Sequence, residues 1–187
     1  MGRSWLGGAV VGYLSLRGNP GGKGMRFLVD AMLGKLARWL RLLGHDAEYG
    51  RDASDEELLA RAAEEGRILL TSDIGLFKRA LSSGISVVLV KGSSEEERLA
   101  LLARRLGIRL EVDLENSRCP KCNSPVVEVP KEAVRGLVPE GSWRRYERFW
   151  RCTGCGQVYW QGSHWSNIEA VLARARELAR ARSSKAP

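Results

Sequence analysis

The chain has 187 residues, of which 44% are hydrophobic and 28% are charged, as is typical of a soluble globular protein. This length allows one ordinary domain or two small ones. No apolar run approaches the roughly 20 residues that a membrane-spanning helix requires, so the sequence predicts no such span.

The net charge of +8 is unevenly distributed along the chain. Residues 1–24 carry three basic groups and no acidic ones, residues 25–113 carry 14 basic and 15 acidic groups, and residues 114–187 carry 13 and 7. The basic excess of the last part favours a phosphate-backbone partner. Arginines that merely solvate a surface would give the same composition.

The first 24 residues form a region of their own. Trp5–Leu16 is apolar after a basic start, as in a weak signal peptide, but glycines interrupt it. Gly18–Gly24 has the composition of a flexible linker. We expect residues 1–24 to be a disordered extension or a misassigned start, and the folded unit to begin at Met25.

Three aspartates follow three short predicted strands, which are Arg26–Asp30, Ala47–Tyr49 and Arg67–Thr71. The first strand ends on Asp30, the loop after the second reaches Asp55, and Asp73 comes shortly after the third. The carboxyl ends of parallel strands form the crevice in which ligands bind. Carboxylates brought together repel one another unless a cation intervenes, and hard divalent ions prefer oxygen ligands. The pattern therefore predicts a Mg²⁺ or Mn²⁺ site for phosphoryl transfer.

Basic residues follow Asp30 on a predicted helix, Ala31–Leu43, which has apolar residues at helical spacing and a glycine after its end. We expect Lys35 or Arg38 to contact a substrate phosphate. Arg41 fits a solvated basic face at least as well.

The middle aspartate has a structural alternative. Ser54–Glu57 (SDEE) has the capping-box pattern, in which Glu57 closes the box and Asp55 complements the positive end of the helix. From this pattern alone, Glu57 is mostly structural and Asp55 could serve either purpose.

The next elements alternate between strand and helix. Ile85–Val90 reads as a buried strand, Ser94–Leu106 as a helix that ends at Gly107, and Ile108–Asp113 as a fifth strand. This alternation predicts an α/β fold with a parallel sheet and flanking helices.

All four cysteines lie in the basic part of the chain, as two C-x-x-C pairs with 29 residues between them. This spacing predicts a closed, four-thiolate structural zinc site rather than disulfides. The predicted ligands are Cys119, Cys122, Cys152 and Cys155.

Short strands at Val126–Val129, Arg148–Arg151 and Gln157–Trp160 would form the zinc ribbon. Tryptophans lie among arginines in this region, and together they suit the stacking of bases and the binding of phosphates. The alternative is that the tryptophans only cover a thin core. The candidate RNA-binding residues are Arg144, Arg145, Arg148 and Trp165.

The last predicted element is a helix that opens with a second capping-box pattern, Ser166–Glu169. One face carries the apolar residues Ile168, Leu172 and Ala175. We expect this helix to dock back on the body of the protein.

Three stretches together carry a family resemblance: Phe27–Gly44 (FLVDAMLGKLARWLRLLG), Gly66–Asp73 (GRILLTSD) and Cys152–Trp165 (CTGCGQVYWQGSHW). They resemble the PIN-like ribonucleases of the Mutator-seven C-terminal family, with its appended zinc ribbon. The resemblance implies a PIN-like nuclease domain at 25–114, a zinc ribbon at 115–165, and a C-terminal helix and tail at 166–187.

By the same resemblance, acids at the ends of parallel strands hold Mg²⁺ or Mn²⁺. Asp30 and Asp73 match the first and third acids of the family, and Asp55 matches the middle one, with Glu57 as its rival. Ser72 joins Lys35, Arg38 and Glu57 as a candidate supporting residue. A fourth acid is not evident.

These observations predict a cytoplasmic, metal-dependent ribonuclease that acts on single-stranded RNA and uses its zinc ribbon to bind that RNA. Neither an organic cofactor nor a membrane partner is expected. The alternative is a non-catalytic RNA-binding or ribonucleoprotein assembly factor, since a fold alone does not establish an activity. The appended ribbon disfavours a toxin of a toxin–antitoxin pair.

Overall fold

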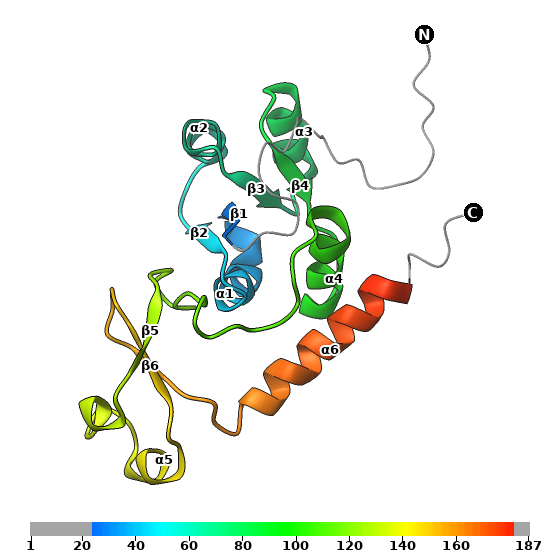
Figure 1. The fold of residues 1–187 in the computed structure, drawn as a ribbon. Coiled ribbons are helices and arrows are strands. Elements are labelled where there is room, and N and C mark those ends of the chain that lie inside the picture. The colour runs from blue at the N-terminus through cyan, green and yellow to red at the C-terminus, as the bar shows by residue number, and fades with distance from the viewer. Residues whose placement is uncertain (1–23, 182–187) are drawn as a thin grey trace.

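The computed structural model describes residues 24–181, which form a parallel sheet with flanking helices and a small antiparallel sheet (Figure 1). The predictions for residues 1–23 lie outside this described part. Within it, no helix is both long enough and apolar enough to cross a membrane.

The first sheet has four parallel strands in the order β2-β1-β3-β4. They are β1 (Arg26–Asp30), β2 (Asp46–Gly50), β3 (Ile68–Thr71) and β4 (Val87–Leu89). The predicted α/β fold and the first four predicted strands are confirmed.

Helices cover both faces of this sheet because its strands are apolar on both sides. A short 3-10 turn (Ala31–Leu33) and α1 (Gly34–Leu42) follow β1, and α4 (Glu95–Leu106) follows β4. Phe27 and Val29 of β1 face the core that α1 and α4 share. Leu28 faces the opposite core, which is built by α2 (Asp55–Glu65) and α3 (Ile74–Ser82). The sheet is thus the middle of three layers (Figure 1).

The predicted fifth strand, Ile108–Asp113, is wrong, because this segment pairs with no strand of the described part of the chain. Ile108 and Leu110 are nevertheless buried in the first core. The carbonyl oxygen of Leu110 accepts a hydrogen bond of 2.6 Å from Arg176. The alternation of apolar residues therefore indicates that this extended segment is buried, but it does not indicate that the segment pairs with a sheet.

The second sheet is antiparallel, with the order β5-β6-β7. Its strands are β5 (Val126–Val129), β6 (Phe149–Cys152) and β7 (Val158–Tyr159), which confirms the predicted strands with small shifts of their ends. A 3-10 turn (Lys131–Val134) and the short helix α5 (Glu140–Arg145) lie between β5 and β6.

The last helix, α6 (Trp165–Ala181), runs from the ribbon back to α4 (Figure 1). Leu172 and Ala175 are fully buried in the core of the first sheet, so the predicted docking is confirmed. The predicted capping box at Ser166 is wrong. The helix begins one residue earlier, and the Ser166 hydroxyl donates to the carbonyl oxygen of Ser163.

Candidate catalytic and metal sites

Asp30 and Asp73 lie at the same end of the parallel sheet and are joined by one hydroxyl group. The Thr71 hydroxyl donates to Asp30 Oδ2 at 2.7 Å and accepts from the Asp73 amide at 3.0 Å. Thr71 is fully buried and ends β3, which pairs in parallel with β1, the strand that ends on Asp30. Sequence reasoning missed Thr71, although a polar residue at the end of an apolar strand was a visible signal.

Each of these two aspartates has one oxygen held by the protein. Asp73 is the N-cap of α3, and its Oδ1 accepts from the Leu76 amide at 2.7 Å. Asp30 Oδ1 and Asp73 Oδ2 have no hydrogen-bond partner among residues 24–181. One oriented and one unpaired oxygen on each carboxylate is an arrangement that suits a shared cation.

Asp55 is the first residue of α2, and its Oδ2 pairs with Arg79 at 3.2 Å. The same guanidinium group pairs with Glu56 at 2.7 Å. Glu57 closes the predicted capping box, since its Oε2 accepts from the Ser54 amide at 2.7 Å. This hydrogen bond, with a second one to the Ser54 side chain, holds the pKa of Glu57 below its usual value. Glu57 is therefore engaged in capping the helix, while Asp55 is engaged with an exposed arginine side chain.

The three aspartates do not form a compact ligand set as their side chains stand. Within residues 24–181, the four cysteines are the one group of three or more metal-binding side chains whose ligand atoms all lie within 4.8 Å of one another. The ligand set of Asp30, Asp55 and Asp73 therefore stays a prediction.

Apolar side chains flank the aspartates at this end of the sheet. Met32 is 73% exposed two residues after Asp30, and Ile74 is 54% exposed directly after Asp73. The Ser72 hydroxyl lies 3.6 Å from the Met32 sulfur. This edge thus offers both carboxylates and an apolar surface to a ligand.

The basic residues of α1 have different environments. Lys35 and Arg38 are exposed and line a hollow that extends to the first cysteine pair. Arg41 is buried, so the expectation of a solvated side chain is wrong. Its Nε donates to the Ala47 carbonyl at 2.7 Å and its Nη1 to the Pro120 carbonyl at 3.0 Å, and burial lowers its pKa.

The four cysteine sulfurs meet at one point, as the spacing predicts. Cys119 Sγ lies 3.7 Å from Cys155 Sγ, and Cys122 Sγ lies 3.3 Å from Cys152 Sγ. The amides of Gly154 and Cys155 each donate to Cys152 Sγ at 3.3 Å. Amide hydrogen bonds to sulfur favour the thiolate, which is the form that binds metal.

The crowding of these sulfurs opposes their joint ionisation. Hydrogen bonds from the amide and hydroxyl of Ser124 lower the pKa of Cys122 to about 6. The Gln157 amide acts to lower the pKa of Cys155, but desolvation and the neighbouring sulfurs together have the larger, opposite effect. The pKa of Cys155 is therefore raised to about 11. Four thiolates ionise together when a divalent ion neutralises them, and a set of four sulfurs fits tetrahedral zinc.

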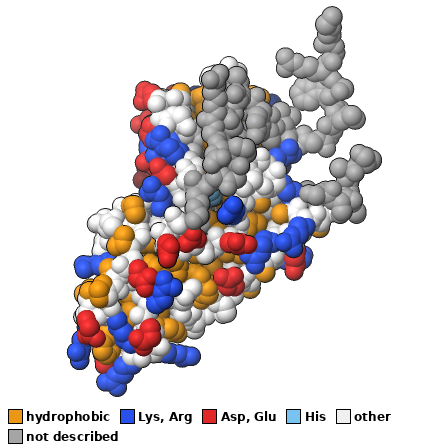
Figure 2. Space-filling view, viewed as in Figure 1, with side chains coloured by type: hydrophobic (Ala, Val, Ile, Leu, Met, Phe, Trp, Pro, Cys, Tyr) orange, Lys and Arg blue, Asp and Glu red, His pale blue; other side chains and the backbone are white. Residues whose placement is uncertain are grey.

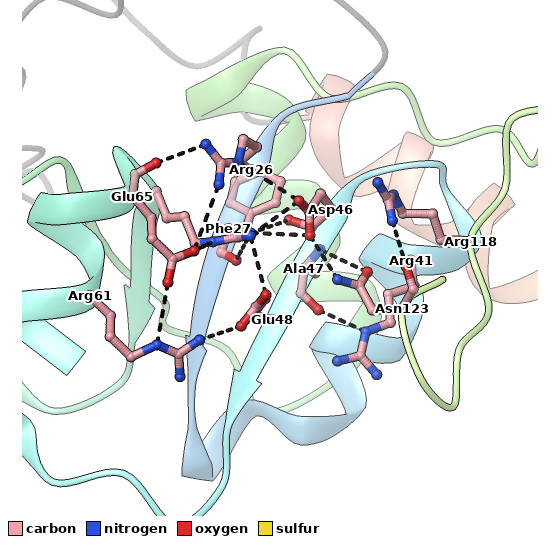
Figure 3. A network of polar contacts seen from close by, with 11 residues as sticks. Arg26, Phe27, Arg41, Asp46, Ala47, Glu48, Arg61, Glu65, Arg118 and Asn123 are labelled. Atoms are coloured by element: carbon pink, nitrogen blue, oxygen red, sulfur yellow. Dashed lines mark hydrogen bonds and ion pairs between the residues drawn. The ribbon is translucent and has the colours of Figure 1, made fainter. Parts of the chain in front are cut away.

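The first cysteine pair is attached to the free edge of the parallel sheet. Asn123, which has a left-handed φ of 70°, accepts a hydrogen bond from the Ala47 amide at 3.2 Å and donates to Asp46 Oδ1 at 2.7 Å. Arg41 binds the carbonyl of the same Ala47 (Figure 3). These two side chains satisfy the backbone amide and carbonyl of Ala47 on the outer edge of β2, a kind of edge that otherwise favours pairing with another strand.

A network of paired charges occupies the amino end of the same sheet (Figure 3). Arg67 is 5% exposed and pairs with Glu65 at 2.5 Å, Asp46 at 3.1 Å and Glu48 at 3.3 Å. Arg61 also pairs with Glu48. Burial raises the pKa of Asp46, but hydrogen bonds from Arg67 and Asn123 outweigh it and hold the pKa below its usual value.

The candidate RNA-binding arginines of the ribbon are exposed, but two of them are already paired. Arg144 pairs with Glu140 at 2.8 Å, and Arg148 makes two hydrogen bonds, of 2.9 and 2.6 Å, with Glu128. Arg145 lies over the Tyr146 ring. In Figure 2, basic and acidic side chains are interspersed over the end of the molecule where the ribbon lies.

The tryptophans of the ribbon divide between core and surface. Trp150 is 1% exposed, and Trp143 and Trp160 pack against the core formed by Val134 and Phe149. For these residues the structural alternative is correct. Trp165, at the start of α6, is half-buried.

The fold and its two sites define an α/β domain with carboxylates at one strand edge and an attached four-cysteine ribbon. The Mut7-C RNAse domain family model matches residues 25–172, which is most of the chain and includes both sheets. The chain therefore belongs to the Mut7-C RNAse domain family, as the sequence resemblance indicated. Membership indicates a ribonuclease-like function, with RNA as substrate or partner. Searches of curated proteins and of solved structures found no match.

Proposed function

We propose that the protein is a PIN-like ribonuclease that hydrolyses phosphodiester bonds of single-stranded RNA with the help of Mg²⁺ or Mn²⁺. The observation that carries this proposal is the link from Asp30 through Thr71 to Asp73 at the carboxyl edge of the sheet. Family membership supports the substrate class.

In this proposal Asp30 and Asp73 hold the ion through the oxygens that have no other partner, and Asp55 completes the set. Thr71 and the Leu76 amide orient the first two carboxylates. Asp55 joins the set when its exposed side chain leaves Arg79, with which it pairs at 3.2 Å. A surface ion pair of this kind stabilises by at most about 1 kcal/mol, so a divalent ion competes with it readily.

A bound divalent ion supplies an activated water and stabilises the charge that builds up on the scissile phosphate. Met32 and Ile74 provide an apolar surface beside the reacting phosphate, against which a ribose or base can pack. Ser72 supports Met32 from the loop that leads to Asp73.

The zinc ribbon is the second part of the proposal. Cys119, Cys122, Cys152 and Cys155 hold structural Zn²⁺, and the exposed Arg144, Arg145 and Arg148, with the half-buried Trp165, contact RNA. Thiolates that hold zinc persist in a reducing compartment, which agrees with the predicted cytoplasmic location.

The test is cleavage of a labelled single-stranded RNA with added Mn²⁺ or Mg²⁺. Wild-type protein cleaves it, and Asp30→Asn loses at least about 100-fold in rate, because the ion loses a charged ligand. Glu65→Gln, at the other end of the sheet, is the matched control and keeps its activity. Equal rates for wild type and Asp30→Asn would defeat the catalytic assignment.

The alternative of a non-catalytic RNA-binding factor rests on the spacing of the aspartates, which exceeds 4.8 Å for the set of three. Tight RNA binding by the wild type, without cleavage at any concentration of Mn²⁺ or Mg²⁺, would favour it.

A further inference from the structure

A basic hollow lies between the parallel sheet and the zinc ribbon. It has a volume of about 910 Å³, and its lining includes Lys35, Arg38, Arg51, Lys121, Tyr49 and Tyr159. We call it the knuckle groove. Its walls come from α1, from the end of β2 and the residue after it, and from the two cysteine-bearing segments.

Most basic side chains of the knuckle groove have no carboxylate partner in the described part of the chain. Among residues 24–181, the side chains of Lys35, Arg38 and Lys121 form no hydrogen bond or ion pair, and Arg51 pairs with Asp52 at a long 3.9 Å. None of the described residues that line the groove is an aspartate or a glutamate. Like charges that gather without counter-charges repel one another, and a polyanion that binds there relieves this repulsion.

This distinguishes the groove from the arginine surface of the ribbon. Arg144 and Arg148 must leave Glu140 and Glu128 before they can pair fully with a phosphate. Lys35, Arg38 and Lys121 have no such partner in the described part of the chain. The groove therefore gains more from each phosphate that it binds.

The groove begins beside the proposed catalytic edge. Asp30 pairs in register with Gly50, and Arg51 is the next residue along the chain. The Tyr49 hydroxyl donates to the Ala31 carbonyl at 2.7 Å, directly after Asp30. From this end the groove extends toward Lys121, which lies between the first two cysteines.

Two tyrosine rings are fixed in the wall of the groove. Tyr49 lies close against α1 because residue 34 is glycine, where an added Cβ would stand 2.8 Å from the tyrosine hydroxyl. The Tyr159 hydroxyl is 3.0 Å from Cys119 Sγ, and this contact holds its ring beside the first cysteine pair. Immobilised aromatic rings beside unpaired cations are the usual elements of a single-strand binding channel.

We propose that the RNA strand whose scissile phosphate lies at Asp30 and Asp73 continues through the knuckle groove. Lys35, Arg38, Arg51 and Lys121 bind its successive phosphates, and the groove supplies more affinity than the arginine surface of the ribbon. This inference rests on the proposed function, since it assigns the path of the same substrate. It gives the ribbon a second purpose, which is to form one wall of the substrate channel.

The test measures binding of a fluorescent single-stranded RNA by anisotropy, in the Asp30→Asn background so that no cleavage intervenes. Arg38→Glu and Lys121→Glu are each expected to weaken binding at least about 10-fold. Each should also reduce the salt dependence of log Kd by about 0.7 for every phosphate that the variant no longer binds. Arg174→Glu, an exposed charge reversal on α6, is the matched control and leaves binding unchanged. Arg148→Glu weakens binding less than either groove variant.

Zinc content and circular dichroism check that Lys121→Glu keeps its ribbon, and Arg38→Glu tests the groove from outside the ribbon. If Arg148→Glu weakens binding more than both groove variants, or if the groove variants match Arg174→Glu, the channel is overturned. Cleavage by wild-type protein in that case leaves the proposed function intact. Absence of both binding and cleavage in wild type overturns the function and the channel together.

Discussion

The two ends of the parallel sheet both gather acidic residues, but they neutralise them differently. At the amino end, Asp46, Glu48 and Glu65 meet three arginines, and every carboxylate has a guanidinium partner. At the carboxyl end, the Asp30 carboxylate accepts from the Thr71 hydroxyl and the Asp73 carboxylate from the Leu76 amide, and one oxygen of each remains without a partner among the described residues.

Under the proposed function, we expect this difference to separate stability from function. Charges that pair within the chain stabilise the fold and need nothing else. Carboxylates that are held in place but have no positively charged partner keep their negative charge uncompensated, and an external cation can compensate it. Substitutions at the amino end should therefore change stability, and substitutions at the carboxyl end should change activity.

The largest expected effect comes from zinc removal, which tests whether the two sheets are separable. Metal binding contributes about 10–16 kcal/mol in comparable zinc sites, so a chelator should unfold the ribbon. We expect the parallel sheet to survive, because water can replace the Asn123 side chain at the edge of β2 and the Pro120 carbonyl that Arg41 binds. Hydrogen exchange should then accelerate in residues 117–160 and stay slow in β1 and β3. Loss of protection in β1 and β3 at the same chelator concentration would show one cooperative unit instead.

Asp73→Asn separates catalysis from capping at the carboxyl end. Asparagine is as good an N-cap as aspartate, so α3 should keep its start and the melting temperature should hardly change. Cleavage should fall at least about 100-fold, because the proposed ion loses a charge. A variant that melts early but cleaves normally would assign Asp73 to capping alone.

His45 gives the amino end a predicted pH dependence. It is buried beside Phe27, its ring nitrogens have no hydrogen-bond partner among the described residues, and burial lowers its pKa from 6.5 to about 4. The unfolded chain therefore binds a proton between these pH values that the folded chain does not. The contribution of neutral His45 to the free energy of unfolding should be fully present above pH 6.5. At pH 5 the free energy of unfolding should be about 2 kcal/mol lower.

Denaturant titrations at pH 7 and pH 5 measure this loss. In His45→Leu the difference between the two pH values should nearly vanish. An equal pH difference in both proteins would show that other groups cause it.

Asp46→Asn is expected to have the smallest effect, a loss of about 1–2 kcal/mol in the free energy of unfolding at pH 7. The pKa of Asp46 is depressed in the folded state, so its contribution is present above the ordinary value of 3.8 and is lost as the pH falls below it. The variant and the wild type should therefore converge in stability at low pH. RNA cleavage at pH 7 should be unchanged, and a cleavage defect without a stability defect would break the comparison between the two ends.

Much of the parallel sheet could be predicted because its signals are local. Short apolar strands that end at Asp30 and Thr71 predict a buried parallel sheet, and they predict that Asp30 and Asp73 lie at its carboxyl end. The C-x-x-C spacing likewise specifies a common point for four sulfurs. Helix α3 lies outside the predicted elements, because an aspartate just after a strand fits a metal ligand as well as the N-cap of a following helix.

The attachment of the ribbon could not be predicted, because it depends on contacts between distant residues. Asn123 reaches the edge of β2 across 76 positions of sequence, and Arg41 reaches Pro120 across 79. The sequence around Asn123 does not indicate that it contacts the parallel sheet, and the sequence around Arg41 does not indicate that it contacts the ribbon. Ile108–Asp113 failed for the same reason, since its burial depends on α6, which comes more than 50 residues later.

The most direct test of the central claim is a crystal structure of the protein with Mn²⁺ and a short RNA, with the anomalous signal of manganese used to locate the ion. We predict a peak in contact with Asp30 and Asp73 at the carboxyl end of β1 and β3, with a phosphate beside it. Manganese bound elsewhere, with both aspartates free of metal and RNA, would contradict this claim.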